Sequence, residues 1–186
     1  DDCEFEAGKT YRFTMHIVQS AKNDGARLTI TENGEPAKFN LWVGDTQVTA
    51  ENFKSVPLTD GTAQYDPLSK RLFLENAIIS PTGEGEGLKS KIDGLAIYAD
   101  GLNVITATSA TALQNEAPHF TVAGDGRIIL SGKSFGFYTA PGSAVTFKGC
   151  VIDCDGSFGS DNNGAEISLD HATIKAKGKD KATICG

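Results

Sequence analysis

The chain has 186 residues, of which 39% are apolar and 22% are charged, with a formal net charge of −7. The apolar fraction excludes an intrinsically disordered chain, and the length fits one domain or one domain with a small appendage. The net negative charge argues against nucleic acid as a partner, because phosphate binding requires clustered Lys and Arg side chains. No stretch approaches the run of about 18 apolar residues that a membrane-spanning helix requires, so we expect no membrane insertion.

Residues 1–63 have the pattern of antiparallel β structure. Apolar and polar residues alternate over 11–18 and again over 27–31, which is typical of half-buried strands, with an Asn-Asp-Gly turn signal between them. A single helical turn is expected after Thr49, its N-cap, with Pro57 as its stop. The sequence therefore predicts an N-terminal antiparallel β element over residues 1–63, which caps the unit that follows.

From residue 64 to residue 186 the dominant signal is internal repetition, with a step of about 22–25 residues. Each repeat begins with two apolar residues on either side of one other residue. These pairs are Leu72/Leu74, Leu95/Ile97, Phe120/Val122, Val145/Phe147 and Ile167/Leu169. A second apolar position follows each pair, and a further strand is predicted at Leu88, Leu113 and Phe137. Three short strands per repeat, with Gly at the corners, predict an all-β fold: a short parallel β-helix of about five coils over residues 64–186.

These apolar columns leave one strand face turned outward. Its middle column is mostly small and polar and consists of Phe73, Ala96, Thr121, Thr146 and Ser168. The adjacent outward column consists of Glu75, Tyr98, Ala123, Lys148 and Asp170. Because solenoids use such stacked faces as extended binding surfaces, we expect a polymer to lie flat on this one. The predicted ligand-binding residues are Tyr98, Lys148 and Asp170, with His119 on the other side of the same face.

The most acidic loop contains Asp153, Asp155 and Asp161, whose carboxylates could bind Ca²⁺. The spacing does not fit an EF-hand, and Gly, Ser, Asn and Asp are also the ordinary residues of a solvated turn. A calcium site and a plain turn both stay open.

The chain has four cysteines, at positions 3, 150, 154 and 185. They permit three complete disulfide pairings, among which the sequence does not choose. A zinc site is disfavoured, because no second Cys/His pair lies at the usual ligand spacing from Cys150 and Cys154.

Two patterns raise the question of catalysis. Ser134 stands in Gly-Lys-Ser-Phe-Gly, which matches the nucleophile elbow of hydrolases, but Pro141 follows too soon for the helix that the elbow requires. Lys148 near Asp170, with Arg127 in a nearby turn, has the residue types of a polysaccharide lyase, yet such a pair more often forms a salt bridge. We assign no catalytic residue.

Three segments carry a resemblance to a known family. They are a Trp-Val-x-Gly strand within 41–49, a Tyr-Asp-Pro turn within 61–67 and a Leu-x-Leu-x-Asn-Ala-x-Ile coil within 71–79. Together they resemble the lead-in to right-handed parallel β-helix proteins exported by gut-type bacteria, whose coils are similar to carbohydrate-binding, pectate-lyase-like folds. Residues 1–40 are similar to the closing strands of a fimbrillin-like β-sandwich, an adhesin module. The resemblance implies an extracellular or surface-attached, glycan-associated protein.

The expected function is accordingly a non-catalytic cell-surface or secreted module for glycan binding or adhesion. Its expected partner is a polysaccharide or surface glycan, and no cofactor is expected apart from the Ca²⁺ ion considered above. Two alternatives stay open: a polysaccharide lyase or other carbohydrate-active enzyme, and a structural spacer of a larger surface protein.

Overall fold

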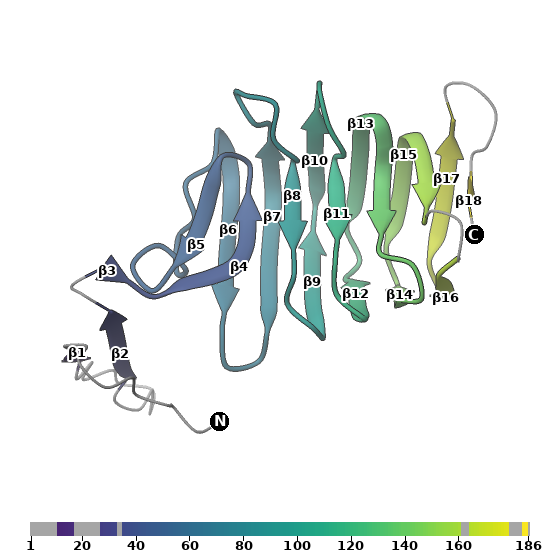
Figure 1. Ribbon diagram of the computed structural model, residues 1–186. Helices are drawn as coiled ribbons and strands as arrows, with labels where there is room; N and C mark the ends of the chain where they lie inside the picture. Colours follow the sequence, from purple (N-terminus) through teal and green to yellow (C-terminus); the bar gives the residue numbers. More distant parts are fainter. Residues whose placement is uncertain (1–10, 17–26, 33–34, 161–163, 179–183, 186) are drawn as a thin grey trace.

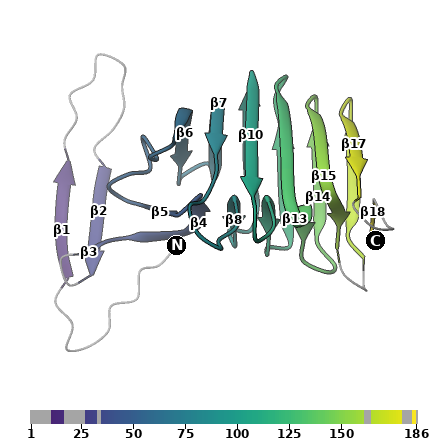
Figure 2. The same cartoon turned by 90° about the horizontal axis from the view of Figure 1, so that it is seen from above.

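The computed structural model describes residues 11–16, 27–32, 35–160, 164–178 and 184–185. Over these residues the chain is all-β and forms a β-solenoid of about four turns, as the repeat predicts. Figure 1 shows the turns stacked in chain order along the solenoid, and Figure 2 shows the same stack from above. None of the described residues forms a helix that is long and apolar enough to span a membrane.

The first face of the solenoid is the one on which the sequence places the binding residues. Its strands are β7 (Arg71–Ile79), β9 (Leu95–Asp100), β12 (His119–Ala123), β14 (Ala144–Lys148) and β16 (Glu166–Asp170). They pair in parallel, each with the strand one turn away. Five strands bound four turns, which is why the structure has about four turns where the sequence predicts about five coils.

Two further faces complete each turn. The second face contains the end of β7, β10 (Leu102–Ala107), the first half of β13 (Arg127–Thr139), β15 (Val151–Gly159) and β17 (Thr173–Lys177). The third face contains β8 (Leu88–Ser90), β11 (Leu113–Asn115), the ends of β13 and β15, and β18 (Ile184–Cys185). All of these pairings are parallel, so the backbone hydrogen bonds run along the solenoid.

Antiparallel strands flank the first turn, as the sequence predicts. β4 (Lys38–Val43) pairs with β8 and with β5 (Thr46–Thr49), while β6 (Asp60–Asp66) pairs with β7. The ring of Phe39 packs 6.4 Å from that of Phe53 and 5.2 Å from that of Tyr65, which covers the apolar end of the solenoid. β1 (Tyr11–His16), β2 (Arg27–Glu32) and β3 (Glu35–Pro36) form a separate antiparallel sheet, which confirms the predicted hairpin.

The predicted helical turn is present only as one hydrogen-bonded turn. The amide of Phe53 donates to the carbonyl of Thr49 at 3.0 Å. Thr49 and Asn52 cap each other, because the amide of Thr49 donates to Asn52 Oδ1 at 2.7 Å and the amide of Asn52 donates to Thr49 Oγ1 at 3.4 Å. The chain then returns to strand β6, so no helix develops.

The predicted apolar columns form the core. Leu95, Phe120, Val145 and Ile167 pair in register, as do Ile97, Val122, Phe147 and Leu169, and as do Leu88, Leu113 and Phe137. Phe137 is fully buried and lies 6.3 Å from Phe120, 5.4 Å from Phe147 and 4.9 Å from Phe158, measured between ring centroids. The first and third faces therefore meet in one aromatic cluster.

The predicted register of the first turn is wrong by two residues. Leu72 pairs with Ile97 rather than Leu95, and Leu74 pairs with Ala99. Both registers satisfy the apolar pattern, because Leu95, Ile97 and Ala99 all face inward and are buried. The observed register gives the first turn the same length as the two turns that follow it.

The last turn is less covered than the turns before it. Leu169 pairs with the buried Phe147 and is the last residue of that column, yet its side chain is 54% exposed. Ile167 is only partly buried. Among the described residues, no further turn lies over them.

The predicted Asp-Gly corner at residues 100–101 has a steric cause. Gly101 has a φ of +64°, and a Cβ atom there would lie 2.2 Å from Asn76 Oδ1. Only glycine fits this corner without displacing the turn before it.

A buried asparagine, which the sequence pattern does not single out, ties this corner to the previous turn. Asn103 has no solvent exposure. Its Oδ1 accepts a hydrogen bond from the amide of Ala77 at 2.9 Å, and its Nδ2 donates to the carbonyl of Asp100 at 2.9 Å. Asn103 thus satisfies two backbone groups at a point where the strand ladder bends.

We predict that Asn103→Ala lowers the free energy of unfolding by about 2 kcal/mol, because it removes the partner of the buried amide of Ala77 and of the partly buried carbonyl of Asp100. Asn40, which is exposed on β4, is the matched control, and Asn40→Ala should stay within about 0.5 kcal/mol of the parent. Urea denaturation monitored by circular dichroism measures both values. Equal stability of the two variants would contradict the role assigned to Asn103.

Candidate functional site

The small outward row predicted for the first face is present. Ala96, Thr121, Thr146 and Ser168 are cross-strand neighbours on four consecutive strands of this face. The register correction places Arg71, not Phe73, next to Ala96. Because these four side chains are short, the row forms a low floor that runs along the solenoid.

One side of this floor is bounded by the row that contains Tyr98. The ring of Tyr98 is stacked on that of Phe73 with centroids 5.6 Å apart and planes 26° apart. The guanidinium of Arg71 lies 5.2 Å from the centroid of the same ring. The sequence places Glu75 next to Tyr98, so this aromatic pair is a consequence of the corrected register. Stacking and the cation–π contact hold the Tyr98 ring in one orientation.

Lys148 and Asp170 lie further along the same row and form an ion pair, with Nζ and Oδ2 3.1 Å apart. The hydrogen bond from His171, at 2.5 Å, and that from Lys148 hold the pKa of Asp170 below its usual value. Both side chains of the pair are well exposed, at 65% and 44%. The pair thus offers an ammonium donor and a carboxylate acceptor to solvent.

Ala123 stands in this row between Tyr98 and Lys148, and it is 6% exposed. Its short side chain separates the ring of Tyr98 on one side from the Lys148–Asp170 ion pair on the other. Two strand spacings separate Tyr98 from Lys148, or about 10 Å. This spacing is about the length of one or two sugar rings.

His119 lies on the opposite side of the floor, at the start of β12. Its Nδ1 is 2.8 Å from Asp93 Oδ1, its amide donates to the same oxygen at 3.0 Å, and its side chain is 69% exposed. Four residues along the strand, or about 13 Å, separate it from Ala123. The structure places His119 on the predicted face but not in contact with Tyr98, Lys148 or Asp170.

The structure describes two of the three predicted calcium ligands. Asp153 lies on the second face, where it forms an ion pair with Arg127. Asp155 follows two residues later on the same strand, and Asp161 lies outside the described residues. Within the described part of the chain, no three His, Cys, Asp or Glu side chains are grouped so that they could bind a metal ion.

The two described cysteine side chains, Cys150 and Cys154, are buried free thiols. Burial raises the pKa of the Cys154 thiol to about 11. A thiol with this pKa is protonated at neutral pH and is a poor nucleophile and metal ligand. Cys3 lies outside the described residues.

Ser134 is part of strand β13, residues 127–139. The nucleophile elbow requires a sharp turn from a strand into a helix, and β13 continues through Ser134 as a strand. The Gly-x-Ser-x-Gly match therefore lies within a strand and does not form the nucleophile elbow of a hydrolase.

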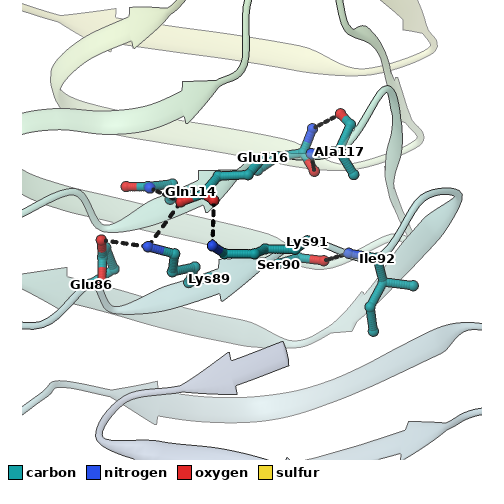
Figure 3. A network of polar contacts seen from close by, with 9 residues as sticks. Glu86, Lys89, Ser90, Lys91, Ile92, Gln114, Glu116 and Ala117 are labelled. Carbon is teal, nitrogen blue, oxygen red and sulfur yellow. Dashed lines mark hydrogen bonds and ion pairs between the residues drawn. The ribbon is translucent and has the colours of Figure 1, made fainter. Parts of the chain in front are cut away.

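The third face carries a network of polar side chains that the sequence pattern does not indicate (Figure 3). Lys89 Nζ lies 3.2 Å from Glu86 Oε1 and 2.8 Å from Glu116 Oε1. Lys91 Nζ lies 3.0 Å from Glu116 Oε2, and Gln114 Nε2 donates to Glu116 Oε1 at 2.7 Å. The residues come from two turns, and the parallel pairing of β8 with β11 brings them together.

Glu116 is the centre of this network. Burial acts to raise the pKa of its carboxyl, but hydrogen bonds from Lys89, Lys91 and Gln114 outweigh burial and lower the pKa to about 2. The same ion pairs raise the pKa of Lys89 although burial opposes this. Both groups are therefore charged at neutral pH.

No protein-family model, no curated protein and no solved structure matches this chain. The β-solenoid architecture thus rests on the strand pairing itself.

Glu116→Gln should lower the free energy of unfolding by about 1 kcal/mol near pH 7, because it removes the shared partner of two lysines. The folded-state pKa of about 2 lies below the ordinary value of 4.5. The stabilisation from Glu116 is therefore complete above pH 4.5 and is lost as the pH falls toward 2. Denaturant titrations of both proteins should show their difference shrinking over that range. Glu75→Gln, outside the network, serves as control, and a difference that stays constant down to pH 2 would refute the assignment.

Proposed function

We propose that this protein is a non-catalytic glycan-binding module of a secreted or cell-surface protein. The observation that carries the proposal is the fixed ring of Tyr98 in one outward row with the exposed Lys148–Asp170 ion pair. Glycan sites commonly combine an aromatic ring, which packs on the apolar face of a sugar, with charged groups that hydrogen-bond its hydroxyls. This first-face site offers both.

Preorganisation supports the proposal. The Tyr98 ring is held by Phe73 and Arg71, and the Lys148 and Asp170 side chains are held by each other. All five strands of the face are fixed by backbone ladders. A ligand that binds to groups already in place loses less free energy to ordering them, which favours affinity.

The charge state of Asp170 favours binding over catalysis. Hydrogen bonds from His171 and Lys148 lower its pKa, so the carboxylate is a weak base near neutral pH. General-base catalysis is most effective when the pKa lies near the working pH. The lead-in segments that resemble exported β-helix proteins point to the same glycan-associated role outside the cell.

We predict that Tyr98→Ala and Lys148→Ala each weaken glycan binding at least tenfold, because the first removes the stacking ring and the second removes the ammonium donor. The change in unfolding free energy should be about 1 kcal/mol or less, since both residues are outward-facing. A glycan array with the labelled protein identifies a ligand, and titration calorimetry with that ligand gives the affinities.

Lys175→Ala is the matched control, because Lys175 is an exposed lysine on the second face and should bind like the parent. If Tyr98→Ala and Lys148→Ala also bind every array ligand like the parent, the first face is scaffold, and the spacer alternative replaces this proposal.

A further inference from the structure

A continuous outward row also crosses the third face. Trp42, Lys89, Gln114 and Tyr138 are cross-strand neighbours on β4, β8, β11 and β13. Each lies between inward neighbours that are buried, and each is itself partly exposed. Three strand spacings, or about 14 Å, separate the two aromatic residues at the ends. The row thus has an aromatic ring at each end and hydrogen-bonding side chains between them.

A cavity of about 330 Å³ lies beside Trp42, at the N-terminal end of this row. Glu86, Lys89 and Lys91 line it together with Trp42. This volume is at the lower end of the range for ligand pockets and fits a sugar ring. At the other end of the row, Phe135 packs edge-on against Tyr138 with ring centroids 5.1 Å apart, which restricts the orientation of the Tyr138 ring.

The charges of this face cancel within the network of Figure 3. Glu86, Lys89, Lys91 and Glu116 contribute two negative and two positive charges, and each forms an ion pair with another member. A charged ligand would have to displace one of these partners. Asp45, which also lines the cavity, accepts hydrogen bonds from Thr82 and disfavours an anionic ligand further.

Neutral hydroxyl groups can bind without breaking the ion pairs. A carboxylate has about four acceptor positions and an ammonium has three donors, so ion pairing leaves each with unused capacity. Lys91, whose side chain is 47% exposed, uses one donor on Glu116 and presents the others to solvent. The network is a fixed array of donors and acceptors for an uncharged polar ligand.

From these observations we propose that the third face is a second binding site, for a neutral, extended, β-linked polysaccharide. The polysaccharide lies across the strands, with one sugar stacked on Trp42 and another stacked on Tyr138. The sugars between them contact Lys89, Gln114 and Glu116. The row advances by one strand spacing per turn, which is close to the length of one sugar in such a chain. The site shares with the proposed function only the glycan class of its ligand and uses none of the first-face residues.

The test uses the full chain, affinity gel electrophoresis, and four probes: soluble β-glucan, glucomannan, arabinoxylan and polygalacturonate. The reference protein is Y98A/K148A, which removes the first-face site, and it is compared with a variant that adds W42A and Y138A. We expect the reference protein to bind at least one neutral probe and the fourfold variant to bind it at least tenfold more weakly. Trp42→Phe keeps an aromatic ring and should retain most of the binding, which separates stacking from damage to the fold.

Three results would overturn the third-face site. The first is equal binding of the neutral probe by the reference protein and the fourfold variant. The others are that the reference protein binds polygalacturonate alone, or that it loses the neutral probe when the salt concentration is raised. The proposed function fails separately, when Tyr98→Ala and Lys148→Ala leave array binding unchanged.

Discussion

In a parallel solenoid, the backbone pairing between consecutive turns decides which side chain lies next to which. The pairing of Leu72 with Ile97 shows how much depends on it. A shift of two residues leaves the core apolar, yet it decides whether Tyr98 has an aromatic or an acidic neighbour. The backbone hydrogen bonds therefore determine both the buried columns and the outward rows. The spacing of the residues in each proposed binding site depends on the same hydrogen bonds.

The buried columns could be predicted from the sequence because apolar residues recur at the positions that face inward. Phe120, Val122 and their partners leave no other register for the central turns. The first turn was ambiguous, because Leu95, Ile97 and Ala99 offer three inward positions for two apolar partners. An apolar pattern specifies which face of a strand is buried. It does not specify the alignment with the neighbouring strand when one strand has more inward apolar positions than the other.

The outward sites were predictable only in part. Tyr98, Lys148 and Asp170 lie in one row as the repeat predicts, because this row is adjacent to the well-defined central columns. The third-face row was missed, since β8 and β11 have three residues each and carry too little pattern to be aligned. Asn103 was missed for another reason: it is a polar residue at an inward position, and its function is to bind backbone groups that the sequence does not display.

Charged residues on this solenoid pair between turns more than within them. Lys148–Asp170, Arg127–Asp153 and Lys89–Glu116 each join neighbouring strands. Exposed pairs of this kind add little to stability. Their main effect is to fix long side chains in one position, which keeps the faces ordered in the absence of a ligand.

The outward rows have one property that follows from their construction. Each row gains one position per turn, so duplicating the segment that encodes a single turn would lengthen both faces by one strand and leave the existing positions unchanged. Ligand length and affinity could therefore evolve, or be engineered, by changing the number of turns rather than by redesigning a pocket. A surface built in this way grows in steps of one strand spacing, and each step adds its own share of the core that supports it.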